Sequence, residues 1–91
     1  MAEFIVESSL PLENWDVSKV AAIGRCGDCS IPIGTKFSVL RVGKSSREIE
    51  LIVESIHAYG RSLTELSAGL TGCLVLCGQA GEVSNSILGT V

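Results

Sequence analysis

The chain has 91 residues, of which 46% are hydrophobic, and this length suits one domain with a small core. Its net charge of −3 disfavours unspecific nucleic-acid binding, because such binding needs positive charge to displace counterions from phosphates. No run approaches the roughly 18 apolar residues of a membrane span, and the first residues lack the basic flank of a signal peptide, so we expect a cytoplasmic protein.

Short strands separated by turn residues are expected along the first half of the chain. Residues 4–10 and 17–25 predict two strands, and a turn at residues 26–29 follows the second. A short extended piece at residues 31–35 contains Pro32, which favours an edge position. Residues 36–42 predict a strand with Phe37 and Val39 on one face, and residues 43–46 predict the next turn.

Residues 47–57 show the clearest alternation in the sequence, with apolar residues on one face and glutamates on the other. The apolar residues are Ile49, Leu51 and Val53, and the acidic ones are Glu48, Glu50 and Glu54. Ile56 falls on the acidic face of this pattern. We therefore expect either a bulge near Ser55 or an exposed apolar spot.

The last third of the chain is organised around the apolar run from Cys73 to Cys77, which lies between two glycines. The run is too short for a stable helix and predicts a strand buried on both faces. Before it, residues 58–67 predict a loop in which residues 62–65 have the pattern of a capping box that starts a helical turn. After it, we expect a turn at residues 79–82 and a weaker strand at residues 83–91.

Six or seven short strands without a long helix predict a small barrel or sandwich that occupies residues 1–91 as a single domain. Closure of the sheet would remove the exposed edges that make short β-proteins aggregate.

Two segments resemble the second domain of translational GTPases such as elongation factor Tu. One is Gly24-Arg25 with residues 31–39, Ile-Pro-Ile-Gly-Thr-Lys-Phe-Ser-Val, which is similar to that family's Gly-Arg, turn and apolar-x-apolar-Gly pattern. The other runs from residue 53 through Ala68-Gly69 to residue 78, and residues 10–13 are similar to the start of the family's domain. The resemblance covers most of residues 4–90. It implies an all-β fold, a small closed antiparallel six-stranded Greek-key barrel.

The chain also departs from this family. Cys77 stands where the family usually has Arg, and Cys29 where it usually has Gly. The sequence contains no Gly-x-x-x-x-Gly-Lys-Ser/Thr, so we expect no nucleotide hydrolysis. In the family, this barrel contacts the GTPase domain, the acylated end of tRNA or ribosomal RNA, and the resemblance implies contacts of this kind. In the region of the tRNA-end pocket, Glu13 is the only residue that matches.

The four cysteines form the pairs Cys26-x-x-Cys29 and Cys73-x-x-x-Cys77. Residues four apart on a strand lie roughly 13 Å apart, too far for two Zn–S bonds of about 2.3 Å. We therefore expect Cys73 and Cys77 to be small core residues. Cys26 and Cys29 are expected to be exposed in a turn, where a disulfide, a redox pair and a metal site stay open. We expect no metal and no cofactor.

The function predicted from these features is that of a binding module and not of an enzyme. His57 is the only histidine, and although Ser55 and Glu54 are near it in sequence, we expect an ordinary loop histidine without a catalytic role. The candidate partner contacts are Trp15, Tyr59 and Arg61 in loops, with Glu48, Glu50 and Glu54 as a second surface.

A protein partner or a second copy is favoured, RNA is disfavoured by the net charge, and nothing favours DNA or a membrane. Two alternatives remain. One is a small immunity or inhibitor protein that blocks a partner with the acidic face. The other is a metal- or thiol-dependent protein that uses the cysteine pairs.

Overall fold

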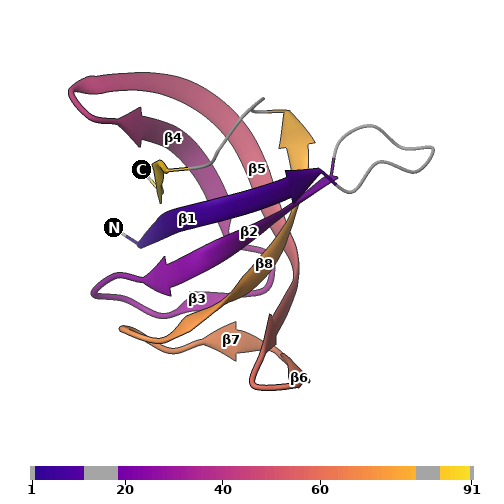
Figure 1. Cartoon of the computed structure of the whole chain (residues 1–91). Coiled ribbons are helices and arrows are strands. Elements are labelled where there is room, and N and C mark those ends of the chain that lie inside the picture. Colours follow the sequence, from indigo (N-terminus) through magenta and orange to yellow (C-terminus); the bar gives the residue numbers. More distant parts are fainter. Residues whose placement is uncertain (1, 12–18, 80–84, 91) are drawn as a thin grey trace.

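All regular structure in the described part of the chain is β-strand. The computed structural model describes residues 2–11, 19–79 and 85–90. The strands in these ranges are β1 (Glu3–Pro11), β2 (Lys19–Cys26), β3 (Ile31–Pro32), β4 (Lys36–Val42), β5 (Ser45–Ala58), β6 (Arg61–Leu63), β7 (Glu65–Leu66), β8 (Thr71–Gln79) and β9 (Ile87–Gly89) (Figure 1). These residues include no helix long and apolar enough to span a membrane.

Six of the strands form a ring in which each strand pairs with two neighbours. The order is β4-β9-β1-β2-β8-β5, the pairing of β5 with β4 completes the ring, and every pairing is antiparallel. Because β2 lies beside β8 and β1 beside β9, the order around the ring is not the order along the chain, as in a Greek key. The strands β3 and β7 pair separately at the lower end in Figure 1. The all-β fold expected from the sequence is confirmed.

The hydrophobic core fills the inside of this ring. The two phenylalanines, Phe4 and Phe37, are fully buried there, together with Leu74 and Leu76 of β8. Burying one such side chain contributes about 1.5–3 kcal/mol. The other core residues with no more than 2% exposure are Val6, Ala22, Cys26, Ile31, Leu40, Leu51, Val53, Ile56, Leu66 and Leu88.

Bulges in β5 and β4 decide which residues face this core. In β5 the register shifts between Val53 and Ser55, so Ile56 returns to the inside and is fully buried. The bulge expected near Ser55 is confirmed, and the exposed apolar spot does not form at Ile56. In β4 the register shifts between Phe37 and Val39, and the next buried residue is Leu40. The expectation that Phe37 and Val39 lie on one face of the strand was wrong for this reason.

The strand β8 pairs with β2 on one side and β5 on the other but, contrary to the prediction from the sequence, it is not buried on both faces. Its inward residues Leu74 and Leu76 are fully buried, whereas Cys73, Val75 and Cys77 point outward and are half-buried. The prediction of Cys73 and Cys77 as core residues was therefore wrong. A closed ring has only one inside, so alternate residues of even its most apolar strand must face outward.

The segment at residues 62–65 forms extended structure instead of a helical turn. Ser62 and Leu63 belong to β6, which pairs with the end of β5, Thr64 is a bend, and Glu65 begins β7, which pairs with β3. The capping-box expectation was wrong because neighbouring strands satisfy these backbone groups. The turn at Ala68-Gly69 does form, with Gly69 at φ +81° and a hydrogen bond from Leu70 N to Ser67 O of 3.1 Å.

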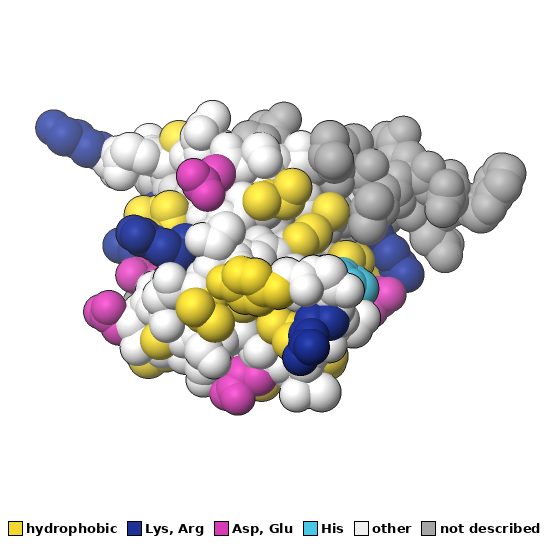
Figure 2. Space-filling view, turned by 60° about the horizontal axis from the view of Figure 1, so that its bottom comes forward, with side chains coloured by type: hydrophobic (Ala, Val, Ile, Leu, Met, Phe, Trp, Pro, Cys, Tyr) yellow, Lys and Arg dark blue, Asp and Glu magenta, His cyan; other side chains and the backbone are white. Residues whose placement is uncertain are grey.

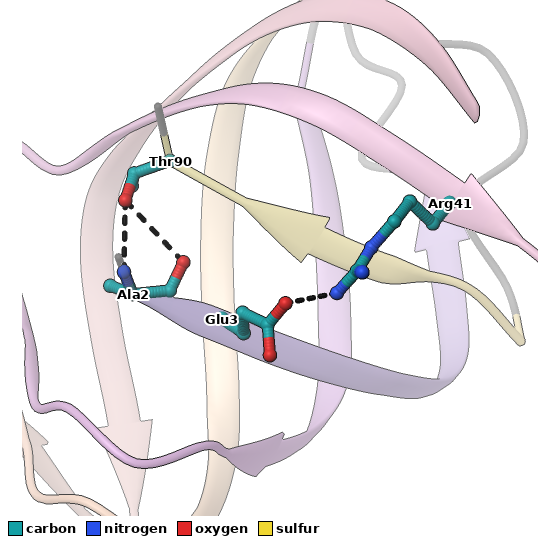
Figure 3. Close-up of polar contacts among 4 residues, drawn as sticks. All are labelled: Ala2, Glu3, Arg41 and Thr90. Carbon is teal, nitrogen blue, oxygen red and sulfur yellow. Dashed lines mark hydrogen bonds and ion pairs between the residues drawn. The ribbon is translucent and has the colours of Figure 1, made fainter.

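The two ends of the described chain are tied together beside β9 (Figure 3). Ala2 N donates to Thr90 Oγ1 at 2.9 Å, and Thr90 N donates to Ala2 O at 3.0 Å. Arg41 of β4 also makes an ion pair with Glu3 of β1, across the intervening β9. Exposed ion pairs contribute less than about 1 kcal/mol, so the strand pairings and the backbone hydrogen bonds account for most of this closure.

Candidate functional site

The tip of the β5–β6 hairpin presents an aromatic side chain in an unusual backbone conformation. Ala58 pairs with Arg61, which leaves Tyr59 and Gly60 as a two-residue turn with φ of +54° and +76°. Turns of this kind favour Asn-Gly, because a bulky residue at positive φ costs about 1–2 kcal/mol. The Tyr59 side chain is nevertheless 71% exposed and gains little burial in return. Strain of this kind is typical of functional positions.

Polar side chains surround this tip. The Ser55 Oγ lies 3.1 Å from His57 Nε2, and the Ser62 Oγ lies 3.4 Å from His57 Nδ1. An open hollow of about 460 Å³ lies beside them, and its lining residues are His57, Ala58, Gly60, Arg61 and Ser62. We call Tyr59, Arg61, His57 and Ser62 the hairpin site. The hairpin site contains Tyr59 and Arg61, which the sequence predicted as partner contacts, together with His57, which it did not.

The contacts of His57 orient its ring without completing a catalytic triad. A serine nucleophile with a histidine base needs a carboxylate on the second ring nitrogen. Here the hydroxyl of Ser62 occupies that place, and Glu54 forms its ion pair with Lys19 at 2.9 Å instead. The two hydroxyls, one at each ring nitrogen, fix the orientation of an exposed imidazole ring.

The predicted acidic surface is exposed but partly paired with lysines. Glu54 bonds Lys19, and Glu50 Oε1 lies 3.9 Å from Lys36 Nζ. Glu48 and Glu50 lie in the first half of β5, whereas the hairpin site lies at its far end. The structure therefore separates the predicted contacts into two surfaces, and the lysines weaken the acidic one as a docking face for a basic partner. Trp15 and Glu13 lie outside the described residues.

The two cysteine pairs differ from what the sequence predicted. Cys26 is buried, not exposed, and its thiol donates to the Cys29 carbonyl at 3.0 Å. Burial, followed by the nearby Cys29 thiol, raises the pKa of Cys26, and burial raises the pKa of Cys73. Both shifts oppose thiolate chemistry at neutral pH. In the described ranges, no three His, Cys, Asp or Glu side chains are grouped so as to hold a metal ion.

The sequence did not predict that Ser62 contacts His57, nor that apolar side chains lie on the outward side of the sheet. Ser62 was assigned to a capping box, and only the pairing of β5 with β6 brings it beside His57. Ile23 of β2 and Ile52 of β5 face outward and are 37% and 43% exposed. Figure 2 shows a face on which hydrophobic side chains gather in the middle and charged side chains stand around them.

Comparisons with known proteins support the fold and leave the family open. No protein-family model matches this chain, and no curated protein does either. Among solved structures, the apo form of translation elongation factor SelB from Methanococcus maripaludis is similar, with a TM-score of 0.71 and 16% sequence identity. The match covers 96% of this chain and 18% of that chain. The resemblance inferred from the sequence thus holds at the level of the fold, which is that of a translation-factor-like β domain.

Proposed function

We propose that this chain is a non-catalytic binding module, related to the second domain of translational GTPases, whose hairpin site takes a protein partner. The observation that carries the proposal is the conformation of Tyr59, an exposed aromatic residue at φ +54°. An ordinary hairpin gains nothing from this strain. A complex in which a protein partner covers Tyr59 gains binding free energy that offsets this strain, because aromatic and arginine side chains are frequent energetic centres of interfaces.

The chemistry around Tyr59 favours protein over RNA as the partner. The site offers one arginine, a histidine held by two hydroxyls and an aromatic ring, which together suit backbone carbonyls and an acidic or apolar side chain. The net charge of −3 opposes a long phosphate backbone. The similarity to a translation factor domain supports the fold on which this hairpin stands.

The test is capture of partners from a lysate of the source cells with the immobilised chain, with and without nuclease. The variant Tyr59→Asn suits this test because asparagine tolerates positive φ and keeps the turn. We expect it to weaken binding of the captured protein by about 30-fold, the usual effect of losing an energetic centre of about 2 kcal/mol. The matched control is Val42→Asn, since Val42 is 49% exposed beside the β4–β5 turn.

The proposal predicts a protein that wild type and Val42→Asn capture, that Tyr59→Asn loses and that nuclease leaves bound. If Tyr59→Asn retains every captured protein, the hairpin site is not the contact. If nuclease releases everything specific, the partner is RNA and the proposal is wrong.

A further inference from the structure

The turn between β2 and β3 brings together two thiols of different exposure. Cys26, the last residue of β2, is only 1% exposed, whereas Cys29 is exposed. The Cys26 thiol donates to the Cys29 carbonyl oxygen at 3.0 Å. From this arrangement we propose that Cys26 and Cys29 form a dithiol site, which reacts with small-molecule disulfides such as oxidised glutathione and closes a disulfide of its own.

The two side chains can be joined by a small change in the turn. The carbonyl oxygen and the Cβ atom of one residue are about 3 Å apart, so the Cys26 sulfur lies within about 6 Å of the Cys29 Cβ atom. In a disulfide the two Cβ atoms are about 3.8 Å apart, and each sulfur lies about 3 Å from the opposite Cβ atom. A displacement of roughly 3 Å therefore suffices to close the bond.

The half of the turn that carries Cys29 is the half that can move. Cys26 N donates to Leu70 O at 2.9 Å, and Gly27 N donates to Glu3 O at 2.8 Å, so the end of β2 is held on both sides. Residues 28–30 lie outside the strands, and the first two of them are exposed. The exposed half of the turn can therefore approach the Cys26 sulfur while β2 keeps its pairings.

The other two cysteines are excluded from this reaction by their positions. Cys73 and Cys77 lie four residues apart on β8, and this spacing places their Cα atoms roughly 13 Å apart, whereas a disulfide allows at most about 6.8 Å. Both point outward from the ring, whereas Cys26 is part of the core. Among the four thiols, the structure therefore singles out the pair in the turn.

The reaction takes place in two exchange steps. The Cys29 thiolate attacks one sulfur of oxidised glutathione, the glutathione S–S bond breaks, and one glutathione leaves as its thiolate. The Cys26 thiolate then attacks the Cys29 sulfur of the mixed disulfide and displaces the second glutathione. The two protons from the cysteines go to the two departing thiolates. The chain is oxidised by two electrons, and the glutathione disulfide is reduced by the same two.

The surroundings of Cys26 assign it to the second step. Burial, followed by the nearby Cys29 thiol, raises the pKa of Cys26, while the N–H groups of Gly27 and Ile31 hydrogen-bond its sulfur and act in the opposite direction. A buried thiol with a raised pKa is a poor first nucleophile toward a dissolved disulfide. The second step is intramolecular, so proximity compensates for the small fraction of thiolate.

The first test exposes the whole chain to oxidised glutathione, blocks the remaining thiols with an alkylating agent in denaturant and maps the cysteines by mass spectrometry. Cleavage after arginine and lysine yields one peptide, residues 26–36, that contains both cysteines of the turn and neither cysteine of β8. We expect this peptide to lose two hydrogen atoms, while Cys73 and Cys77 are alkylated. A dithiol should restore the original mass, because the exchange is reversible.

Two variants separate the steps. Cys26→Ser lacks the second nucleophile, so it should accumulate the mixed disulfide on Cys29 to a level about tenfold above that in wild type. Cys29→Ser lacks the first nucleophile, so Cys26 should stay reduced, because it is buried. The matched control, Cys77→Ser, removes a thiol of β8 and should form the disulfide at the wild-type rate. Circular dichroism checks that each variant folds.

Two results with wild type would overturn the dithiol site: both thiols of residues 26–36 stay reduced, or the reaction stops at the mixed disulfide on Cys29. A third result would also overturn it, namely that Cys26 in Cys29→Ser takes up glutathione as fast as wild type reacts. Cys29→Ser changes an exposed residue, so it decides the order of attack even if Cys26→Ser does not fold. All of these outcomes are independent of the hairpin site.

Discussion

The close approach of β1 to β2 at Gly24 gives a strong prediction about stability. Gly24 is buried and pairs with Val6 of β1 and Gly72 of β8. A Cβ atom at Gly24 would lie 1.9 Å from Ile5 O and 3.0 Å from the Val6 Cα. Because these are backbone atoms, no change of rotamer can relieve the contact. In Gly24→Ala, β1 must move away from β2 by more than about 1 Å, a shift larger than close packing tolerates.

The cost of Gly24→Ala follows from what this movement disrupts. Overpacking a core typically costs about 1–3 kcal/mol, and each disrupted ladder hydrogen bond costs about 0.5–1.5 kcal/mol more. The neighbouring Phe4 and Val6 belong to the core and shift with the strand. We expect a loss of about 3–5 kcal/mol in the free energy of unfolding. For a domain of this size, that loss lowers the midpoint of thermal unfolding by about 12 °C or more.

The assay is thermal and urea unfolding of Gly24→Ala beside a matched glycine. Gly89 of β9 is also buried, but a Cβ atom there meets no atom within 4 Å, and its φ is not in the left-handed region. Gly89→Ala should therefore be neutral or stabilising by up to about 1 kcal/mol, because alanine restricts the unfolded chain. Equal effects of the two variants, or a loss below about 1 kcal/mol in Gly24→Ala, would refute so close an approach of β1 to β2.

Three further predictions follow from the core, the turn and the thiols. Leu74→Ala should lower the free energy of unfolding by about 2–5 kcal/mol, whereas Val75→Ala on the outward side should lower it clearly less. Equal losses in urea unfolding would contradict the assignment of Leu74 to the inside of the ring and Val75 to the outside. Tyr59→Asn should raise the thermal midpoint by about 4–8 °C by relieving about 1 kcal/mol of strain, and calorimetry showing a fall would remove the strain argument. Because burial raises the thiol pKa of Cys26 and Cys73 above 9.0, the unfolded chain loses these protons first. The contribution of these two thiols to the free energy of unfolding should therefore be constant below this pH and should be lost as the pH rises through their folded-state pKa values. Urea titrations that show a rise in the free energy of unfolding over this range would be contrary evidence.

Local patterns in the sequence predicted most of the strands. The alternation of glutamates with apolar residues placed β5, and the position of Ile56 out of phase with that alternation indicated the bulge. These predictions held because a strand's two faces repeat every second residue, whatever it pairs with. The same reasoning failed in β4, where the sequence around Ser38 has no signal for a bulge and Leu40 took the place expected for Val39.

The candidate site was predictable only in its exposed residues. Tyr59 and Arg61 were expected in loops, and both are exposed, but only Tyr59 lies in a turn, whereas Arg61 begins β6. The contacts of His57 with Ser55 and Ser62 depend on the register of β5 with β6, which closes a two-residue turn around a tyrosine. No local pattern specifies that turn, since the sequence lacks the Asn-Gly or Asp-Gly that usually marks it.

The sequence by itself determined that this is a small all-β chain with one uncharged, strongly apolar strand, because composition and period-2 alternation act locally. Only the tertiary structure decided which side of that strand is inside. Closing six strands into a ring buries Leu74 and Leu76 and turns Cys73, Val75 and Cys77 outward, although all five residues look alike in the sequence. The physical reason is that a ring encloses one volume, so alternate residues of each strand face outward even where they are apolar.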